Sequence, residues 1–320
     1  MPLGIRPTND FAFKRTFGTV ENRIALISLL NAILDPASPI IEVTLENPYN
    51  LKDYEDDKLS ILDVKAVDQS GAIYDIEMQL TIFEGLVQRI VFYGCELYAD
   101  QLKEGDDYTK AHPVFSICLV DGILWKDATK VHHAFRLTDV GTGRVLKETL
   151  EIHTLELGRY NIREADLKTA DMLDCWLFWF LHAHEYEANA LLKLFPQQAI
   201  RQATHTIVNI AQVTEDKVMY DAREKAIRDQ QWAMNAAHRE GVLEGELKGK
   251  IEGKIEGEIE GEIKGKIEGK IEGEIKLIRT LQAILCMPVS EEQELRALDL
   301  AQLESLTTNL QNRLRNRTSS

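Results

Sequence analysis

Acidic and amide side chains alternate with apolar residues in the segment Tyr74–Leu80. Residues i, i+2 and i+4 of a β-strand share a face, so Asp75, Glu77 and Gln79 are expected to point one way and the apolar residues between them the other way. Carboxylates and an amide on one face of a half-buried strand are side chains that can bind a cation or position a water molecule. This strand is therefore the first candidate for chemistry.

A second strand-like segment, Ile61–Lys65, precedes it across the turn Asp68–Gly71, which predicts a β-hairpin. A hairpin that aligns Asp63 with Glu77 would hold two carboxylates side by side, which is unfavourable unless a cation lies between them. Two hard oxygen ligands with room for water suit Mg²⁺, and the predicted chemistry is metal-assisted hydrolysis, most plausibly of a phosphodiester. The alternative is that these are ordinary polar residues on the solvated face of an antiparallel sheet.

The order of Asp63, about fourteen residues, and Glu77-x-Gln79 resembles the PD-(D/E)XK nuclease signature. The surrounding sequence resembles, more specifically, the recombination-promoting nuclease (Rpn) and transposase family. The matching segments are Pro7–Lys14, Leu29–Leu34, Ile61–Ala66, Ile76–Gln79 and the helix that carries Arg89 and Tyr93. The resemblance covers residues 5 to about 125 closely and the remainder loosely.

The resemblance implies that Asp63 and Glu77 bind one divalent ion, Mg²⁺ or Mn²⁺, with help from the carbonyl of Met78. The same comparison shows a departure, because Gln79 stands where related nucleases often carry Lys. An amide can orient a water molecule but supplies no positive charge. Lys65, on the same strand face as Asp63, is a candidate substitute, and its alternative role is that of a surface lysine.

Further site residues are expected on the flanking helices. Arg89 and Tyr93 are four residues apart and so share a helix face. The resemblance favours a face turned toward the sheet, where the two side chains could bind a phosphate or fix Glu77. It also implies a third acidic group near the N-terminal helix, for which Asp10 and then Glu21 are candidates.

The expected fold is an α/β restriction-endonuclease-like core, a mixed central sheet flanked by helices, followed by further β and helical segments. The pattern predicts a helix after Asn9, a helix over 21–34 with apolar positions Ile24, Ile27, Leu30 and Ile33, and strands over 41–45, 59–67 and 73–80. A helix over 86–102 and a buried strand over 114–120 follow. Helix, three strands, helix, strand is the order that the resemblance implies.

Composition limits the functional classes. A formal charge of −15 argues against a protein that coats nucleic acid non-specifically, because phosphate binding needs clustered Lys and Arg. The longest apolar run, Trp176–Leu181, is too short to span a bilayer, and the aromatic residues of this run are expected in the core. No secretory signal is visible. The four cysteines lack CxxC spacing and are expected to be reduced core residues of a cytoplasmic protein.

A four-residue repeat, Gly-x-(Leu/Ile)-x, runs from Gly241 to Lys276 with nine glycines in register. As a helix, its stripes drift by about 40° per repeat and wind right-handedly. We expect this helix to be steadied by self-association, which makes the chain a homo-oligomer. An exposed strand and a flexible charged spacer are the alternatives.

Four segments are therefore expected. Residues 1–125 form the nuclease core, 126–240 a β and then helical extension with a turn at Asp139–Gly143, 241–276 a helical rod, and 277–320 a helical hairpin. In the last segment, helix 277–285 ends before Pro288 and a capping box begins at Ser290.

The sequence thus favours a metal-dependent DNA endonuclease with a C-terminal assembly region. The alternative is a catalytically weak or inactive nuclease fold that acts as an oligomeric binding module. The residues that favour this alternative are Gln79, the excess of acidic side chains and the long repeat.

Overall fold

The computed structural model describes residues 1–48 and 64–318, and the chain divides into two compact units, Met1–Gln230 and Gln231–Ser320. The first unit contains the predicted strand face, and the second contains the whole repeat. Position 63 and the adjoining part of the first hairpin strand lie outside the described residues.

A six-stranded mixed sheet forms the centre of the first unit, in the order β1-β2-β3-β4-β6-β5. Its strands are β1 (Val43–Leu45), β2 (Val64–Asp68), β3 (Ile73–Gln79), β4 (Val114–Val120), β5 (His132–Arg136) and β6 (Leu150–Glu156). Strands β3, β4 and β6 are parallel, whereas β1, β2 and β5 join the sheet as antiparallel strands.

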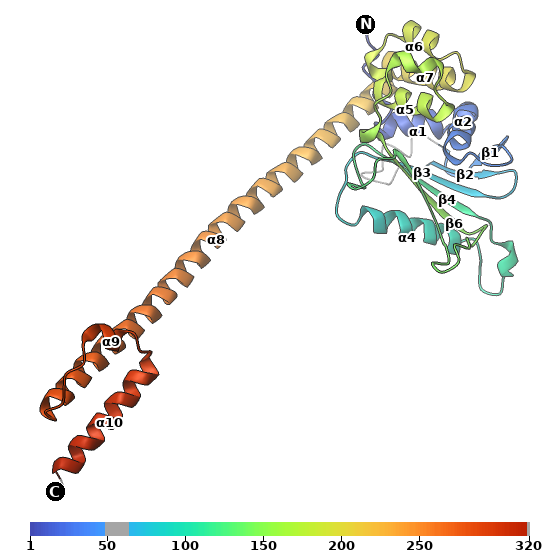
Figure 1. Cartoon of the computed structure of the whole chain (residues 1–320). Coiled ribbons are helices and arrows are strands. Elements are labelled where there is room, and N and C mark those ends of the chain that lie inside the picture. Colours follow the sequence, from blue (N-terminus) through green and yellow to red (C-terminus); the bar gives the residue numbers. More distant parts are fainter. Residues whose placement is uncertain (49–63, 319–320) are drawn as a thin grey trace. The chain divides into compact units, whose positions relative to one another are not determined.

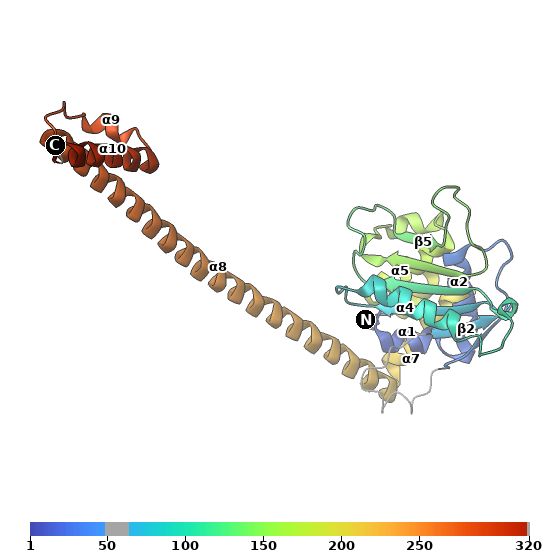
Figure 2. The same cartoon turned by 90° about the horizontal axis from the view of Figure 1, so that it is seen from below.

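Helices cover both faces of this sheet (Figure 1). They are α1 (Asp10–Phe17), α2 (Arg23–Leu34), α4 (Leu86–Ala99), α5 (Met172–His182), α6 (Ala188–Leu194) and α7 (Gln198–Gln212). Helix α4 connects the parallel strands β3 and β4 and lies on one face, and Figure 2 shows it in front of the sheet. Helices α1, α2, α5 and α7 lie on the other face. The predicted α/β order of helix, three strands, helix and strand is confirmed.

Local sequence explains why these elements begin and end where they do. Asn9 caps α1, because its side-chain oxygen accepts the backbone N–H of Phe11 at 3.0 Å and of Ala12 at 3.4 Å. In the β2–β3 turn, Asp68 Oδ1 accepts the backbone N–H of Ala72 at 3.0 Å, and Gly71 takes a φ of +89° that favours glycine. The predicted hairpin turn is confirmed.

Aromatic side chains form the centre of the larger core. The ring of Phe17 lies 5.5 Å from Trp176, 5.7 Å from Phe180 and 6.3 Å from Trp179, in edge and tilted arrangements that aromatic pairs favour. All four side chains are essentially inaccessible to solvent. The expectation that the aromatic run of α5 is core is confirmed.

Two expectations about burial are wrong. Ile24 is 45% exposed, because α2 turns Ala25, Leu26 and Leu29 toward the core in its place. Cys95 on α4 and one C-terminal cysteine, at position 286, are exposed, whereas the two other cysteines are buried and all four are free thiols. Apolar neighbours in sequence do not reveal which side of a helix faces the core.

Helix α8 (Thr214–Ile284) runs without interruption through the repeat, which confirms the helical prediction over a strand or a flexible spacer. Its glycines lower helix stability by about 1 kcal/mol each relative to Ala, or about 9 kcal/mol for nine. Ion pairs four residues apart, such as Lys266–Glu262 at 2.6 Å, offset only a few tenths of a kcal/mol each. The repeat therefore forms a helix of low intrinsic stability.

The C-terminal helices α9 (Glu292–Arg296) and α10 (Leu300–Thr318) pack against the end of α8 through Leu295, Leu303 and Leu310. The predicted capping box at Ser290 is wrong. Ser290 instead accepts a hydrogen bond from Gln282 at 2.9 Å and donates its backbone N–H to the same side chain at 3.0 Å.

Among the residues described, no single helix is long and apolar enough to cross a membrane. One bent pair of helical segments, 10–17 and 20–34, reaches the required length and apolar composition when the two are taken together.

Candidate active site

The polar face of β3 carries two buried carboxylates. Asp75 is 1% exposed and Glu77 is 7% exposed, and in the parallel ladder with β4 they lie beside Ser116 and Cys118. Because successive strand residues alternate in direction, these four side chains share one face of the sheet. Two acidic groups two residues apart in so dry an environment are a costly arrangement that requires compensating partners.

Lys65 lies directly opposite Asp75 in the antiparallel pair of β2 and β3. The two side chains therefore lie on the same face, with Lys65 partly exposed. The backbone N–H of Lys65 donates to Asn47 Oδ1 at 2.8 Å, which ties the strand to the segment before it. The predicted pairing of Asp63 with Glu77 lies outside the part of the chain that the structure describes.

Helix α4 covers this face. Leu86 and Ile90 pack with Cys118 and Val120 in a small core of their own. Gly94 permits the close approach of the helix, because a Cβ there would lie 2.9 Å from Leu150 Cδ1 and 3.4 Å from Ser116 Cβ. These contacts of Leu86, Ile90 and Gly94 place α4 against the face of the sheet that carries the acidic pair.

Arg89 and Tyr93 lie together on α4, as their spacing predicts. The guanidinium carbon of Arg89 is 5.4 Å from the centre of the Tyr93 ring and 6.0 Å from that of Phe83, within cation–π distance of both. The two rings hold the guanidinium in place, half-buried, on the helix that covers Glu77. A cation held in this way can bind a phosphate without first being ordered.

Gln79 is the last residue of β3. Its side-chain Nε2 donates to the carbonyl of Thr81 at 2.9 Å, and its backbone carbonyl accepts the backbone N–H of Asp121 at 2.9 Å. The amide group therefore helps to hold the loop that leads from β3 to α4.

Asp10 is engaged elsewhere. Its carboxylate forms an ion pair with Arg223 of α8, within the first unit, and it also accepts the backbone N–H of Phe11 at 2.8 Å. Burial raises the pKa of Asp10, although the neighbouring Arg223 guanidinium acts to lower it. Glu21 is exposed in the short 3₁₀ helix after α1.

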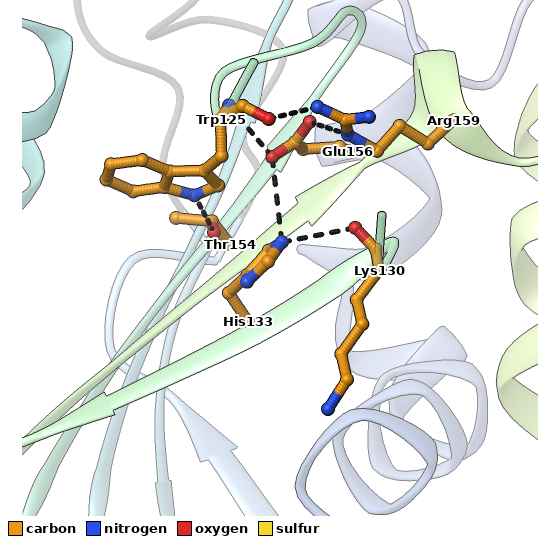
Figure 3. A network of polar contacts seen from close by, with 6 residues as sticks. All are labelled: Trp125, Lys130, His133, Thr154, Glu156 and Arg159. Atoms are coloured by element: carbon orange, nitrogen blue, oxygen red, sulfur yellow. Dashed lines mark hydrogen bonds and ion pairs between the residues drawn. The ribbon is translucent and has the colours of Figure 1, made fainter. Parts of the chain in front are cut away.

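A second polar group lies at the carboxyl end of β6 (Figure 3). Glu156 is fully buried, and its Oε2 is 2.6 Å from Nε of Arg159 while its Oε1 accepts the backbone N–H of Trp125 at 3.1 Å. The indole of Trp125 donates to Thr154 at 3.0 Å, and His133 Nε2 lies 3.8 Å from Glu156. The residues of this group carry no motif or spacing in the sequence that predicts it.

The acidic pair on β3 can be compared with the donor set that a divalent metal ion needs. No set of three or more His, Cys, Asp and Glu side chains among them is arranged to bind a metal ion. Asp75 and Glu77 nevertheless offer hard oxygen donors, which Mg²⁺ and Mn²⁺ prefer. The chemistry of this pair fits such an ion, with further ligands needed from water, substrate or residues outside the described part.

A family model described as PD-(D/E)XK nuclease family transposase matches residues 7–237, which is most of the chain. This chain belongs to that family. The match includes the whole sheet, the helices on both of its faces and the start of α8. Comparisons with curated proteins and with solved structures gave no match. Membership of the PD-(D/E)XK nuclease family transposases indicates a nuclease that binds DNA.

Proposed function

We propose that this member of the PD-(D/E)XK nuclease family transposases is a metal-dependent DNA endonuclease that hydrolyses phosphodiester bonds. The observation that carries the proposal is the burial of Asp75 and Glu77 together on the face of β3 that α4 covers. A divalent ion would compensate this acidic pair, and phosphodiester hydrolysis is chemistry that such an ion assists.

The ion would be Mg²⁺ or Mn²⁺, with Asp63 and Glu77 as ligands and Asp10 as the candidate third acidic group. The charge of Asp75, on the same face of β3 as Glu77, would add to its attraction. When bound, it polarises the scissile phosphate and lowers the pKa of a water molecule. Lys65, on the face of Asp75, would supply the positive charge that Gln79 does not. Gln79 would hold the β3–α4 loop and orient water at the end of the strand.

Substrate contact is assigned to Arg89 and Tyr93. Ring contacts fix the guanidinium of Arg89, so it can hold a phosphate of the DNA backbone in a defined place. Such local positive charge is needed because the chain carries a formal charge of −15 and repels DNA at long range.

The repeat in α8 would assemble copies of the chain into a homo-oligomer. Its Leu and Ile side chains from Leu243 to Ile267 are each 45–66% exposed, an unusual density of exposed apolar residues on one helix. The nuclease core would then lie in residues 1–125, with the following β and helical segments as its support.

A second candidate function is that of an oligomeric binding module with little or no catalysis. The observation that favours it is the position of Gln79, whose amide is bound to the Thr81 carbonyl and supplies no charge to a phosphate. On this alternative, the fold would bind a partner through the same surfaces and leave DNA intact.

Purified chain would be incubated with supercoiled plasmid in Mg²⁺, in Mn²⁺ and in EDTA. Asp63→Ala and Glu77→Ala preparations would be tested alongside, with Glu96→Ala, at an exposed position of α4, as the matched control. Nicking that requires metal, persists in the control and disappears in both variants supports the endonuclease. Intact plasmid with a folded wild-type chain, or cleavage that persists in both variants, contradicts it and favours the binding module.

A further inference from the structure

Helix α8 carries an apolar stripe that its own chain covers at one end only. Ile271 and Ile275 pack in the C-terminal core with leucines of α9 and α10. The preceding members of the same stripe are 45–61% exposed; they are Leu247, Ile251, Ile255, Ile259, Ile263 and Ile267. At its C-terminal end, this stripe is covered by the helices α9 and α10. We therefore expect another helix to cover the exposed part of the stripe as well.

The repeat places four kinds of side chain around the helix. Successive residues are rotated by about 100°, so each Leu or Ile is flanked by two charged stripes and the glycines lie on the opposite side. An added Cβ at any of the nine glycines, from Gly241 to Gly273, would meet no atom within 4 Å. Both the apolar face and the glycine face are therefore open for contact, and the charges beside them differ.

Charges that flank the apolar face are of opposite sign. The pairs around the six exposed repeats are 246/248, 250/252, 254/256, 258/260, 262/264 and 266/268, and five of these six join a Lys to a Glu. Residues two apart do not face each other on a helix, so this pattern has no role within one helix. The ion pairs that α8 does form link residues four apart, as in Lys254–Glu258 at 3.9 Å.

Charges that flank the glycine face are mostly alike. The pairs are 248/250, 252/254, 256/258, 260/262, 264/266 and 268/270, and four of these six join like charges. In a parallel pair of identical helices, the residue before each contact residue of one copy faces the residue after it in the other copy. Pairing through the apolar face therefore matches charges, and pairing through the glycine face opposes them.

The antiparallel arrangement leads to the same choice. With Ile255 opposite Ile259 of a second copy, five of the six facing charge pairs are of opposite sign. With Gly257 opposite Gly261 of a second copy, only two of the six facing charge pairs are of opposite sign. The apolar face is thus complementary to itself in both directions, and the glycine face is complementary in neither.

We propose that α8 binds α8 of a second copy of this chain through its Leu and Ile stripe, with the glycines facing outward. This deepens the assembly role proposed for the repeat and does not depend on nuclease activity. Rows of side chains four residues apart pack ridge into groove at about −50°, which makes the pair right-handed. The glycines keep the outer face free of side chains and take no part in the contact.

Solution mass of the full chain tests which face is used. One variant replaces three exposed contact residues with a good helix former, as Ile255→Gln, Ile259→Gln and Ile263→Gln. The matched variant fills the other face with Gly253→Ala, Gly257→Ala and Gly261→Ala. We expect two chains per particle for wild type and for the alanine variant, and one for the glutamine variant. A wild-type mass other than two chains, dissociation of the alanine variant, or an unchanged mass for the glutamine variant overturns the proposal.

The charge match is tested separately, at low salt, with an exchange variant. In it, the Lys and Glu that flank Leu247, Ile251, Ile255, Ile263 and Ile267 trade places, so composition and net charge are unchanged. Two differently tagged wild-type chains should co-purify, and so should two exchange chains. Wild type and exchange variant should pair at least about tenfold less, because like charges then face each other along the stripe. Equal or preferred mixing overturns the proposal. Neither readout needs cleavage, so their failure is distinct from that of the nuclease.

Discussion

Lys65 faces Asp75 across the β2–β3 ladder, which places a cationic side chain beside a carboxylate that is 1% exposed. This relationship gives the face of β3 a positive charge, which the neutral amide of Gln79 does not supply. If Lys65 serves the reaction, its charge matters more than its length.

Replacing that charge should therefore affect cleavage, and circular dichroism would verify that each variant is folded. We expect Lys65→Met to lower the cleavage rate by about 100-fold, the range of a positioned catalytic group, and Lys65→Arg to retain a substantial part of it. Initial rates on plasmid would be measured with Lys103→Met, at an exposed position, as control. A Lys65→Met rate equal to that of wild type would assign Lys65 a surface role only.

Buried charge at the end of β6 should contribute to stability. Removal of Arg159 in Arg159→Leu leaves the fully buried Glu156 carboxylate without its ion pair, and such changes typically cost about 3–5 kcal/mol. The double variant with Glu156→Gln should recover much of the loss, because the amide can still accept the Trp125 N–H. Urea unfolding of the two single variants and the double variant would measure this coupling. If the double variant loses as much free energy of unfolding as the two single variants together, Arg159 and Glu156 are not coupled.

His153 should make stability fall in mild acid. Burial lowers the pKa of His153 to about 4, from 6.5, although the nearby Glu151 carboxylate acts to raise it. A neutral His153 donates Nε2–H to Glu151 at 3.0 Å and accepts from His132 at 2.8 Å. Since the folded pKa is depressed, the contribution is complete above about pH 6.5 and is lost as the pH falls toward 4. The loss from this group is at most about 3 kcal/mol.

Urea midpoints between pH 7.5 and 4 would show this dependence. We expect a shallower fall for His153→Gln than for wild type, and no change of slope for His238→Gln, at an exposed position of α8. Identical slopes for His153→Gln and wild type would exclude His153 as a source of the pH dependence.

Two glycines of the first unit should differ in their tolerance of alanine. A Cβ at Gly158 would lie 2.9 Å from the backbone of Gly122, which cannot move as a side-chain end can. Gly158→Ala should therefore destabilise the unit by about 1–3 kcal/mol or more. Gly141, where a Cβ would lie 3.5 Å from Asp139 Oδ1, is the control. Thermal unfolding compares the two, and equal midpoints for both variants would contradict the close approach at Gly158.

The elements of this fold were predictable where their signals are local. The Asn9 cap, the Asp68–Gly71 turn and the alternation in β3 each involve residues within a few positions of one another. The repeat was also predictable as a helix, because its Lys and Glu residues recur at the i,i+4 spacing of helical ion pairs even though its glycines disfavour a helix.

The candidate site was predictable only in part, because its environment comes from distant segments. Alternation places Asp75 beside Glu77, but its near-complete burial requires α4, which packs from further along the chain. The ion pair of Asp10 with Arg223, more than two hundred residues away, could not be predicted either, because it joins segments at the two ends of the first unit's sequence. Glu156 was not singled out, because an i,i+3 pair with Arg159 is a common surface pattern and Trp125, 31 residues earlier, meets it only in the folded sheet.

Cleavage by Glu77→Gln is the most direct test of the nuclease assignment. Single-turnover cleavage of an end-labelled duplex would be measured in saturating Mg²⁺ and in EDTA, with circular dichroism to verify folding. We predict that wild type cleaves only with Mg²⁺ and that Glu77→Gln, which keeps size and hydrogen-bonding capacity but loses the charge, is at least about 100-fold slower. A folded Glu77→Gln chain that cleaves at the wild-type rate, or wild-type cleavage in EDTA, would contradict the account.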